Sequence, residues 1–240
     1  MSARSSSSPD WPETAVVTGG ASGIGAAIVA ALEADGVDVE ILDLADGFDV
    51  GNPHDWESVT PVDLVCLNAG MLTGESDIRL LGDDEYRRAL QTNVDGVVFG
   101  VRQLAPLMPR GGAFVVTASL AGLVGMPSDP IYSLTKHAVV GFVRAIAPQL
   151  TERGLRINMV CPGIVDTPML DKGGQREAFD RSGFPLLRPE EVAAAALIAA
   201  HSEETGQAWV VQPGREPLQF RFPGVPGPRV EGAEGALPPL

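Results

Sequence analysis

The stretch "TAVVTGGASGIG" (residues 14–25) decides the fold of this 240-residue chain. Its first five residues form a short apolar run typical of a buried strand, and the residues after Gly23 have helical spacing. Gly19 permits the sharp turn between the two, while Gly23 and Gly25 let the backbone approach a bound group closely. The start of the helix presents free N–H groups and a positive dipole end. The stretch therefore predicts a pyrophosphate-binding turn rather than a glycine-rich turn without a ligand.

Apolar runs alternate with helical patterns over most of the chain. This alternation favours an α/β fold, a single-domain Rossmann-like doubly wound parallel sheet with helices on both faces. The domain would span residues 13–214, between a disordered leader (1–12) and a Pro/Gly-rich tail (215–240) that is either disordered or laid over a neighbouring surface. We predict strands at residues 14–18, 37–44, 62–68, 113–119, 156–163 and 208–214, and helices at 23–36, 83–108, 131–154 and 189–200.

Composition and charge exclude several classes of function. The net charge is −14 and no Lys/Arg cluster occurs, which argues against a nucleic-acid partner. No run of 18 or more apolar residues is present, so we expect no membrane-spanning helix. Cys66 and Cys161 lie in short apolar runs, where buried reduced thiols and a cytoplasmic setting are expected. The three histidines lack metal-ligand spacing, so no metal site is predicted.

Asp43 ends the second predicted strand, 18 residues beyond Gly25. A carboxylate at this place can accept hydrogen bonds from the adenosine ribose hydroxyls of a dinucleotide. Alone it would be an ordinary acidic strand end, but after the glycine-rich turn it predicts NAD. NADP is less favoured, because its phosphate would meet the Asp43 carboxylate. The neighbouring positions that would hold a basic residue in an NADP site carry Ala21, Ser22, Leu44 and Ala45.

The stretch "YSLTKHA" (residues 132–138) places Tyr132 four residues ahead of Lys136. On a helix the two side chains share a face. An ammonium close to a phenol favours the phenolate and lowers its pKa, which would make the pair an acid/base catalyst. The same spacing also suits a half-buried tyrosine beside a surface lysine, and the pair alone does not choose between the two.

Together these residues resemble the short-chain dehydrogenase/reductase family over roughly residues 13–214. Six family motifs occur in order: T-G-x-x-x-G-x-G at 18–25, N-A-G at 68–70, Asn93 in "QTNVDG", Ser119 in "VVTASLAG", the pair Tyr132 and Lys136, and Pro162-Gly163 followed by Thr167. These motifs have the order and spacing typical of the family, which favours the catalytic interpretation of the tyrosine–lysine pair.

The resemblance implies a division of labour. Tyr132 would be the general acid/base at the substrate oxygen. Lys136 would lower the pKa of Tyr132 and hold the nicotinamide ribose, and Ser119 would steady the substrate carbonyl or alcohol. Asn93 would hold a water in a proton relay that reaches Lys136. The residues that the resemblance assigns to the cofactor are Thr18, Gly19, Ser22, Gly23, Ile24, Gly25, Asp43, Asp49, Val50, Asn68, Ala69, Gly70, Tyr132, Lys136, Pro162, Gly163, Val165 and Thr167.

The chain departs from the family pattern in four places. Leu67 stands where the family usually has a first asparagine, and Thr135 where it usually has serine before the lysine. The stretch between Asp43 and Asn68 leaves little room for a helix between strands two and three. Residues 167–189, the usual substrate lid, are also short, so the pocket would be open or completed by another subunit.

The function predicted is an NAD-dependent oxidoreductase acting on a secondary alcohol or ketone. The alternatives are a catalytically silent NAD-binding regulatory protein of the same fold and a purely structural scaffold. The pocket candidates Leu120, Met126 and Met169 are apolar, but they do not identify the substrate. The resemblance also implies a homotetramer, or a homodimer, that associates through the helices predicted at 83–108 and 131–154.

Overall fold

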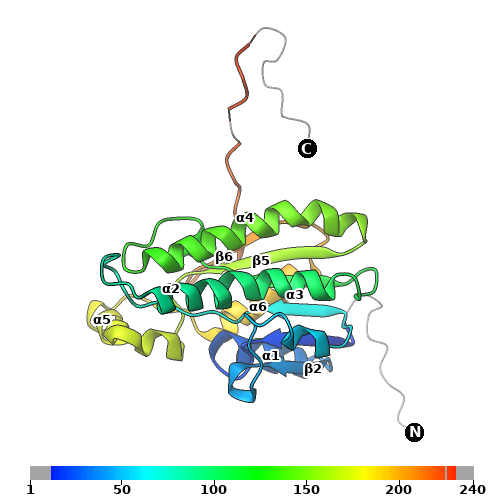
Figure 1. The fold of residues 1–240 in the computed structure, drawn as a ribbon, viewed down its shortest axis with the longest axis horizontal. Helices are drawn as coiled ribbons and strands as arrows, with labels where there is room; N and C mark the ends of the chain where they lie inside the picture. The colour runs from blue at the N-terminus through cyan, green and yellow to red at the C-terminus, as the bar shows by residue number, and fades with distance from the viewer. Residues whose placement is uncertain (1–11, 225, 231–240) are drawn as a thin grey trace.

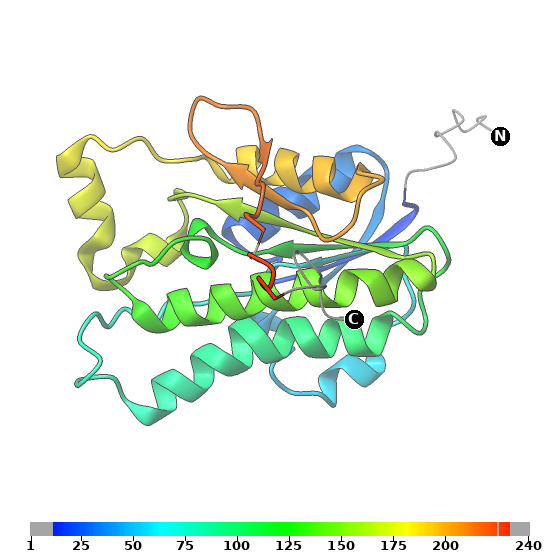
Figure 2. The same cartoon turned by 90° about the horizontal axis from the view of Figure 1, so that it is seen from above.

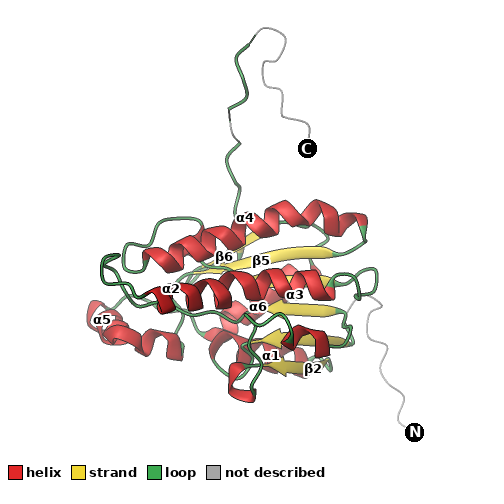
Figure 3. Ribbon diagram, in the orientation of Figure 1, coloured by secondary structure: helices red, strands yellow, loops and turns green. Residues whose placement is uncertain are grey.

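The computed structural model describes residues 12–224 and 226–230, so nearly all of the predicted leader and the end of the tail lie outside the described residues. The chain forms one layered body with a central sheet between two layers of helices (Figures 1 and 3). The strands are β1 (Thr14–Thr18), β2 (Asp38–Leu42), β3 (Leu64–Leu67), β4 (Ala113–Thr117), β5 (Arg156–Pro162), β6 (Ala208–Val211) and β7 (Leu218–Gln219). The α-helices are α1 (Gly23–Ala34), α2 (Asp83–Leu90), α3 (Gly96–Leu104), α4 (Pro130–Glu152), α5 (Gln175–Ser182) and α6 (Pro189–His201).

The sheet has the strand order β2-β1-β3-β4-β5-β6-β7. The first six strands pair in parallel, as predicted, and β7 pairs antiparallel with β6. From β1 the chain runs outward to β2 and then returns to the other side of β1 as β3. This reversal creates a crevice at the carboxyl ends of β1 and β3, where α/β proteins of this type bind ligands.

Two apolar layers hold the sheet between the helices. Helices α1 and α6 cover one face, while α2, α3 and α4 lie along the other (Figure 2). On β1, Val17 packs toward α1 and α6, whereas the preceding Val16 packs toward α3 and α4. Because both faces are covered, strands such as β4 are buried at every position, which explains their unbroken apolar runs.

The helix predicted at 83–108 contains a π turn. Helix α2 ends at Leu90, residues Gln91–Asp95 form the π turn, and α3 runs to Leu104. Asn93 lies inside this turn and is buried. A π turn inserts an extra residue into a helix, often at a functional site, and the apolar periodicity of the sequence does not reveal it.

No α-helix lies between β2 and β3, as the short sequence there led us to expect. Two 3₁₀ turns, Leu44–Asp46 and Asp55–Ser58, take its place. Trp56 in the second turn is fully buried, and its Nε1 donates a hydrogen bond of 2.9 Å to the Val50 carbonyl. A Cβ atom added at Gly100 of α3 would lie 2.8 Å from the Trp56 ring, so the indole fits against a glycine.

The sheet continues past Gly214, where we placed the end of the domain. Leu218 and Gln219 form β7, and the Phe220 and Phe222 rings then meet edge to face at 5.0 Å. The Arg144 guanidinium of α4 lies 3.9 Å from the centre of the Phe222 ring. The described part of the tail beyond Phe222 leaves the body next to α4 (Figure 1).

Candidate active site

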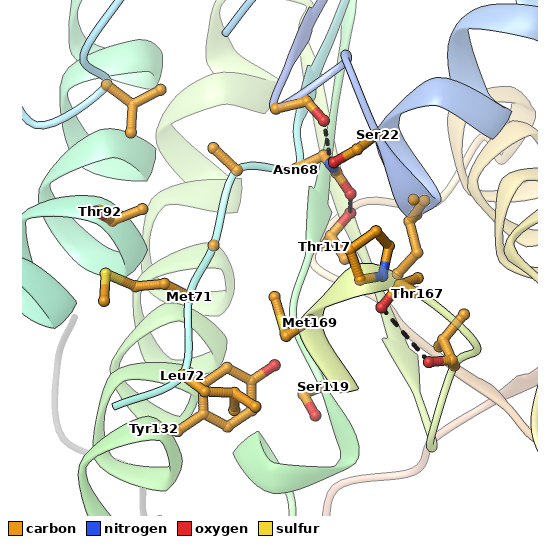
Figure 4. A pocket seen from close by; sticks show the side chains of 18 of the residues that line it. Ser22, Asn68, Met71, Leu72, Thr92, Thr117, Ser119, Tyr132, Thr167 and Met169 are labelled. Atoms are coloured by element: carbon orange, nitrogen blue, oxygen red, sulfur yellow. Dashed lines mark hydrogen bonds between the residues drawn. The ribbon is translucent and has the colours of Figure 1, made fainter. Parts of the chain in front are cut away.

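A cavity of about 740 Å³ extends from the glycine-rich turn after β1 to Ser119 and Tyr132. Ser22 and Asn68 lie toward one end of the view in Figure 4, and Ser119 and Tyr132 toward the other. All predicted site residues line this cavity except Thr18, Gly25 and Asn93. Of the three pocket candidates, Met126 and Met169 line it and Leu120 does not. Lining residues that the sequence did not indicate include Phe48, Met71, Leu72, Arg88, Gln91, Thr92, Thr117 and Leu170.

The turn after β1 has the geometry that a pyrophosphate requires. Gly19 and Gly23 have φ angles of 63° and 54°, in the left-handed region that favours glycine. A Cβ atom added at Gly25 would lie 2.0 Å from the Gly19 carbonyl oxygen, so no side chain fits there. Ser22 precedes α1 and makes no side-chain cap hydrogen bond, which leaves the first N–H groups of the helix to a ligand.

Thr18 and Asn68 hold this turn against the sheet. The Thr18 hydroxyl oxygen accepts hydrogen bonds from the backbone N–H groups of Asn68 and Ala69, at 2.9 and 3.0 Å. The Asn68 side-chain amide donates to the carbonyls of Thr18 and Gly19, and its oxygen accepts from the Thr117 hydroxyl. Asn68 therefore lines the cavity, but the protein itself uses both ends of its side-chain amide.

Asp43 ties the end of β2 to the glycine-rich turn. Its carboxylate oxygens accept hydrogen bonds of 3.0 Å from the backbone N–H groups of Ala21 and Ala45. Each oxygen keeps a second acceptor position for a ligand. Arg88 of α2 lines the same cavity, although it lies far from Asp43 in the sequence. The cavity wall therefore contains a basic side chain, Arg88, that could not be predicted from the residues next to Asp43 in the sequence.

Tyr132 and Lys136 are both buried on α4. Burial raises the pKa of Tyr132 to about 12, while the Ser119 hydroxyl acts to lower it. Burial also lowers the pKa of Lys136 to about 8. The Lys136 ammonium donates a 2.7 Å hydrogen bond to the Thr117 carbonyl and lies 5.5 Å from the centre of the Tyr132 ring. The pKa of Tyr132 therefore moves in the direction opposite to that expected from the pair, because desolvation outweighs the hydrogen bond with Ser119.

Ser119 follows β4 and begins a short 3₁₀ turn, Leu120–Gly122. Its hydroxyl oxygen accepts a 3.1 Å hydrogen bond from the Ala121 N–H. A hydroxyl group that accepts such a bond still has its own hydrogen to donate. Ser119 is therefore held in place and can donate toward a substrate oxygen beside Tyr132.

Asn93 joins three segments behind the cavity wall. Its side-chain oxygen accepts from the Met71 N–H at 2.8 Å, and its amide donates to the Met71 carbonyl and the Thr135 hydroxyl. A Cβ atom added at Gly70 would lie 3.4 Å from the Asn93 side-chain oxygen and 3.5 Å from the Lys136 ammonium. Gly70 thus lies between the two side chains and keeps the space between them open.

The end of the cavity around Tyr132 is apolar. Tyr132, Leu72 and Ala121 form a small buried cluster, and Met126 and Met169 pack against it. Met169 belongs to a short lid made of a 3₁₀ turn, Pro168–Gly174, and helix α5. A ligand that reaches Ser119 and Tyr132 would therefore contact mainly hydrocarbon and thioether groups.

Three further observations concern the thiols, the possible metal ligands and the helices of the described residues. Cys66 and Cys161 are buried free thiols, and burial raises the pKa of each to about 12. Within residues 12–224 and 226–230, no three His, Cys, Asp or Glu side chains gather as a metal site would need. None of the helices that the structure describes is long and apolar enough to cross a membrane.

Comparisons with known proteins agree with this architecture. The family model described as enoyl-(acyl carrier protein) reductase matches residues 55–215. An uncharacterized short-chain type dehydrogenase/reductase of Sinorhizobium fredii is 32% identical over 83% of this chain, which spans only 43% of that protein. The 2,5-dichloro-2,5-cyclohexadiene-1,4-diol dehydrogenase of Sphingobium indicum is 30% identical over 77% of this chain and 88% of its own length. The crystal structure of a Burkholderia thailandensis oxidoreductase of the short chain dehydrogenase/reductase family shares the fold, with a TM-score of 0.73 and 24% identity over 85% of this chain and 92% of that one.

Proposed function

The chain belongs to the short-chain dehydrogenase/reductase family, and we propose that it transfers a hydride between NAD(H) and an apolar secondary alcohol or ketone. The proposal rests on one observation. The Ser119 and Tyr132 hydroxyls meet at the apolar end of a cavity whose other end is the glycine-rich turn after β1. The catalytically silent alternative has no support, because the polar groups for turnover are all present and the relatives with functional names include several dehydrogenases and a reductase.

Tyr132 would exchange a proton with the substrate oxygen. With its pKa near 12 the phenol is neutral at pH 7, which suits donation to a ketone. Accepting a proton from an alcohol requires additional positive charge near the phenol, which lowers its pKa. The Ser119 hydroxyl would donate a hydrogen bond to the same substrate oxygen and hold it at Tyr132. When bound, the nicotinamide cofactor supplies or accepts the hydride.

Lys136 would serve both the cofactor and the proton path. With a pKa near 8 it is protonated in most molecules at pH 7, and an ammonium has three N–H donors. One donor is used by the Thr117 carbonyl, which leaves two for a ribose hydroxyl and for the space beside Gly70. The Asn93 side chain is engaged with Met71 and Thr135, so its role in a proton relay would be to shape that space.

NAD is the cofactor that Asp43 supports. Its carboxylate lies in the cavity wall with acceptor positions to spare, and a 2′-phosphate beside it would be repelled. The position of Arg88 in the same cavity wall favours NADP, and the variants Asp43→Asn and Arg88→Gln distinguish the two cofactors.

The substrate would be uncharged at its reacting end. Leu72, Met126 and Met169 belong to the apolar cluster around Tyr132, and burying a charge among them would be costly. The Sphingobium indicum relative is named for a chlorinated cyclohexadienediol, a ring that carries secondary alcohols. We therefore choose ring alcohols such as cyclohexanol, and their ketones, as the first substrates to test.

We also propose a cytoplasmic homotetramer, or a homodimer as the smaller assembly. Helix α4 exposes Leu134, Ala138, Gly141 and Ala145 at helical spacing, a mostly small apolar stripe suited to a second copy of the helix. The two buried free thiols support a reducing compartment. Light scattering that shows only a 25.1 kDa species at micromolar concentration would contradict the assembly.

The activity test is an incubation of the protein with NAD and a panel of ring, acyclic and charged alcohols, together with NADH and the matching ketones. We expect the absorbance of reduced nicotinamide to rise with uncharged ring alcohols and to fall with their ketones. Binding of NAD without turnover of any alcohol or ketone would contradict the proposal.

A further inference from the structure

Asp129 is a fully buried carboxylate that none of the sequence motifs includes. It precedes α4 and stands three residues before Tyr132. One oxygen, Oδ1, accepts hydrogen bonds of 2.8 Å from the Tyr132 N–H and the Thr73 hydroxyl. The other, Oδ2, accepts from the N–H groups of Thr73 and Gly74, at 2.8 and 2.9 Å. All four acceptor positions of the carboxylate are therefore used.

Capping a helix does not require this arrangement. A serine or threonine satisfies a helix N-terminus with a single hydrogen bond, which here is the bond to the Tyr132 N–H. A buried carboxylate is costly unless hydrogen bonds compensate its charge. The other three bonds of Asp129 all go to Thr73 and Gly74. The charge therefore stabilises the position of a loop that lies 55 and 56 residues earlier in the sequence.

This loop forms part of the substrate end of the cavity. We call residues 71–74 the wall loop. Met71 and Leu72 line the cavity, and Leu72 packs with Tyr132 (Figure 4). Asn93 holds the first residue of the wall loop through both main-chain groups of Met71. Asp129 holds its last two residues, so the loop is fastened at both ends and Leu72 lies between the two attachments.

We propose that Asp129 is a positioning residue that fastens the wall loop to the helix carrying Tyr132, so that the substrate-binding surface and the proton donor keep a fixed relation. The kinetic consequence rests on the proposed function. The attachment itself does not, because it can be measured without turnover.

The charge of Asp129 has a separate effect that the test must control. Its negative charge raises the pKa of Tyr132, as do burial and Cys161 of β5. Ser119 after β4 acts in the opposite sense, and the Lys136 ammonium lies 5.5 Å from the Tyr132 ring. Any neutral residue at position 129 removes this charge. Two neutral variants, one that keeps the contacts with the wall loop and one that loses them, therefore distinguish the effect of the loop position from the effect of the lost charge.

The test compares Asp129→Ser with Asp129→Asn. Serine keeps the cap on the Tyr132 N–H but is too short to reach Thr73 and Gly74. Asparagine keeps the size of the side chain, and its oxygen can accept from both loop N–H groups while its amide donates to the Thr73 hydroxyl. Its amide nitrogen then stands where Oδ1 accepted from the Tyr132 N–H, so this variant keeps the wall loop attached and loses the helix cap, the reverse of serine. We expect Asp129→Ser to raise the KM for the alcohol about tenfold or more, since it loses three hydrogen bonds. Asp129→Asn should stay within about threefold of the parent protein, and the Kd for NAD should not change in either variant.

Asp77→Ser is the matched control. Asp77 is a carboxylate in the segment after the wall loop, but it pairs with the exposed Arg79. We expect its KM to equal that of the parent protein. If Asp129→Ser does not fold, Thr73→Val removes one of the three loop bonds and should raise the KM roughly threefold. Two results would overturn the proposal. One is an equal increase in KM for Asp129→Ser and Asp129→Asn, and the other is a KM of Asp129→Ser no higher than that of Asp77→Ser.

Hydrogen exchange at the Thr73 and Gly74 amides decides the proposal even if the protein turns over no alcohol. Both N–H groups donate to Asp129, so their exchange should be slow in the parent protein. We expect faster exchange at these two amides in Asp129→Ser, with exchange in β4 unchanged. Fast exchange in the parent protein would overturn the attachment, whereas an absence of turnover alone would overturn only the proposed function.

Discussion

The two sides of the substrate end are held by contacts of different kinds. The wall loop is fastened by buried groups, the Asn93 amide and the Asp129 carboxylate. The lid, residues 168–182, is held by Arg176. The Arg176 guanidinium forms ion pairs with the carboxylates of Asp166 and Asp171, and its Nε lies 2.5 Å from the Asp171 oxygen. It also donates a hydrogen bond of 2.9 Å to the Thr167 carbonyl. The Arg176 side chain is 34% exposed, and its two carboxylate partners are 52% and 61% exposed.

The wall loop makes five hydrogen bonds with Asn93 and Asp129, whereas Arg176 has three partners, one of which, Asp171, belongs to the lid itself. The surrounding solvent differs as well. Hydrogen bonds to a buried charged group are worth about 1.5–3 kcal/mol each, whereas an exposed ion pair contributes roughly 0–1 kcal/mol and is screened by salt. We therefore expect the wall loop to stay in place during turnover and the lid to move.

The largest effect should come from the buried phenol. Tyr132→Phe removes the proposed acid/base hydroxyl, and we expect kcat to fall at least ~100-fold. The Kd for NAD should hardly change, because the ring stays packed against Leu72. Steady-state kinetics and a fluorescence titration with NADH measure the two quantities. A variant with near-parental kcat would show that another group moves the proton.

Lys136→Met should weaken both the affinity for NAD and kcat, because in the proposed function the lysine serves the cofactor and the proton path. It should also change how stability depends on pH. The pKa of Lys136 is about 8 in the folded protein and 10.5 in its ordinary state, so the unfolded chain binds more protons between these values. The parent protein therefore gains stability relative to the methionine variant as the pH rises from 8 to 10.5.

Denaturant unfolding of both proteins at several pH values measures this difference. We expect the free energy of unfolding of the parent protein, minus that of Lys136→Met, to rise by about 1 kcal/mol per pH unit inside the window. Tyr132, Cys66 and Cys161 have raised pKa values and destabilise both proteins at high pH, so they largely cancel in the difference. A difference that does not change with pH would mean that Lys136 titrates normally.

The half-buried Asp43 should have an intermediate effect. Asp43→Asn removes the charge that disfavours a 2′-phosphate, so the ratio of kcat/KM for NAD to that for NADP should fall about tenfold or more. The measurement uses one alcohol and both cofactors. If the parent protein instead prefers NADP and Arg88→Gln abolishes that preference, Arg88 rather than Asp43 decides the choice of cofactor.

The smallest effect should come from the lid. Arg176→Gln removes the two exposed ion pairs, and we expect the KM for the alcohol to rise only about twofold to fivefold at low salt. The difference from the parent protein should shrink as the salt concentration rises, because salt already screens the pairs. An effect as large as that of Asp129→Ser, and independent of salt, would show that both sides of the pocket are held equally firmly.

The features of this protein that depend on neighbouring residues could be predicted from the amino-acid sequence. The glycine spacing over residues 18–25 predicts the turn, because positive φ angles and close backbone contacts select glycine locally. The alternation of apolar runs and helical patterns predicts the six parallel strands that the sheet contains. The spacing of Tyr132 and Lys136 places them on the same helix, because i and i+4 share a face.

The features that depend on distant residues and on burial became visible only in the folded structure. Thr73 and Asp129 are 56 residues apart, and Arg88 approaches the cavity from another helix, so no local pattern marks either. Nor does the spacing of Tyr132 and Lys136 reveal that both side chains are out of water. That desolvation raises one pKa and lowers the other, because removing water disfavours the charged form of each group.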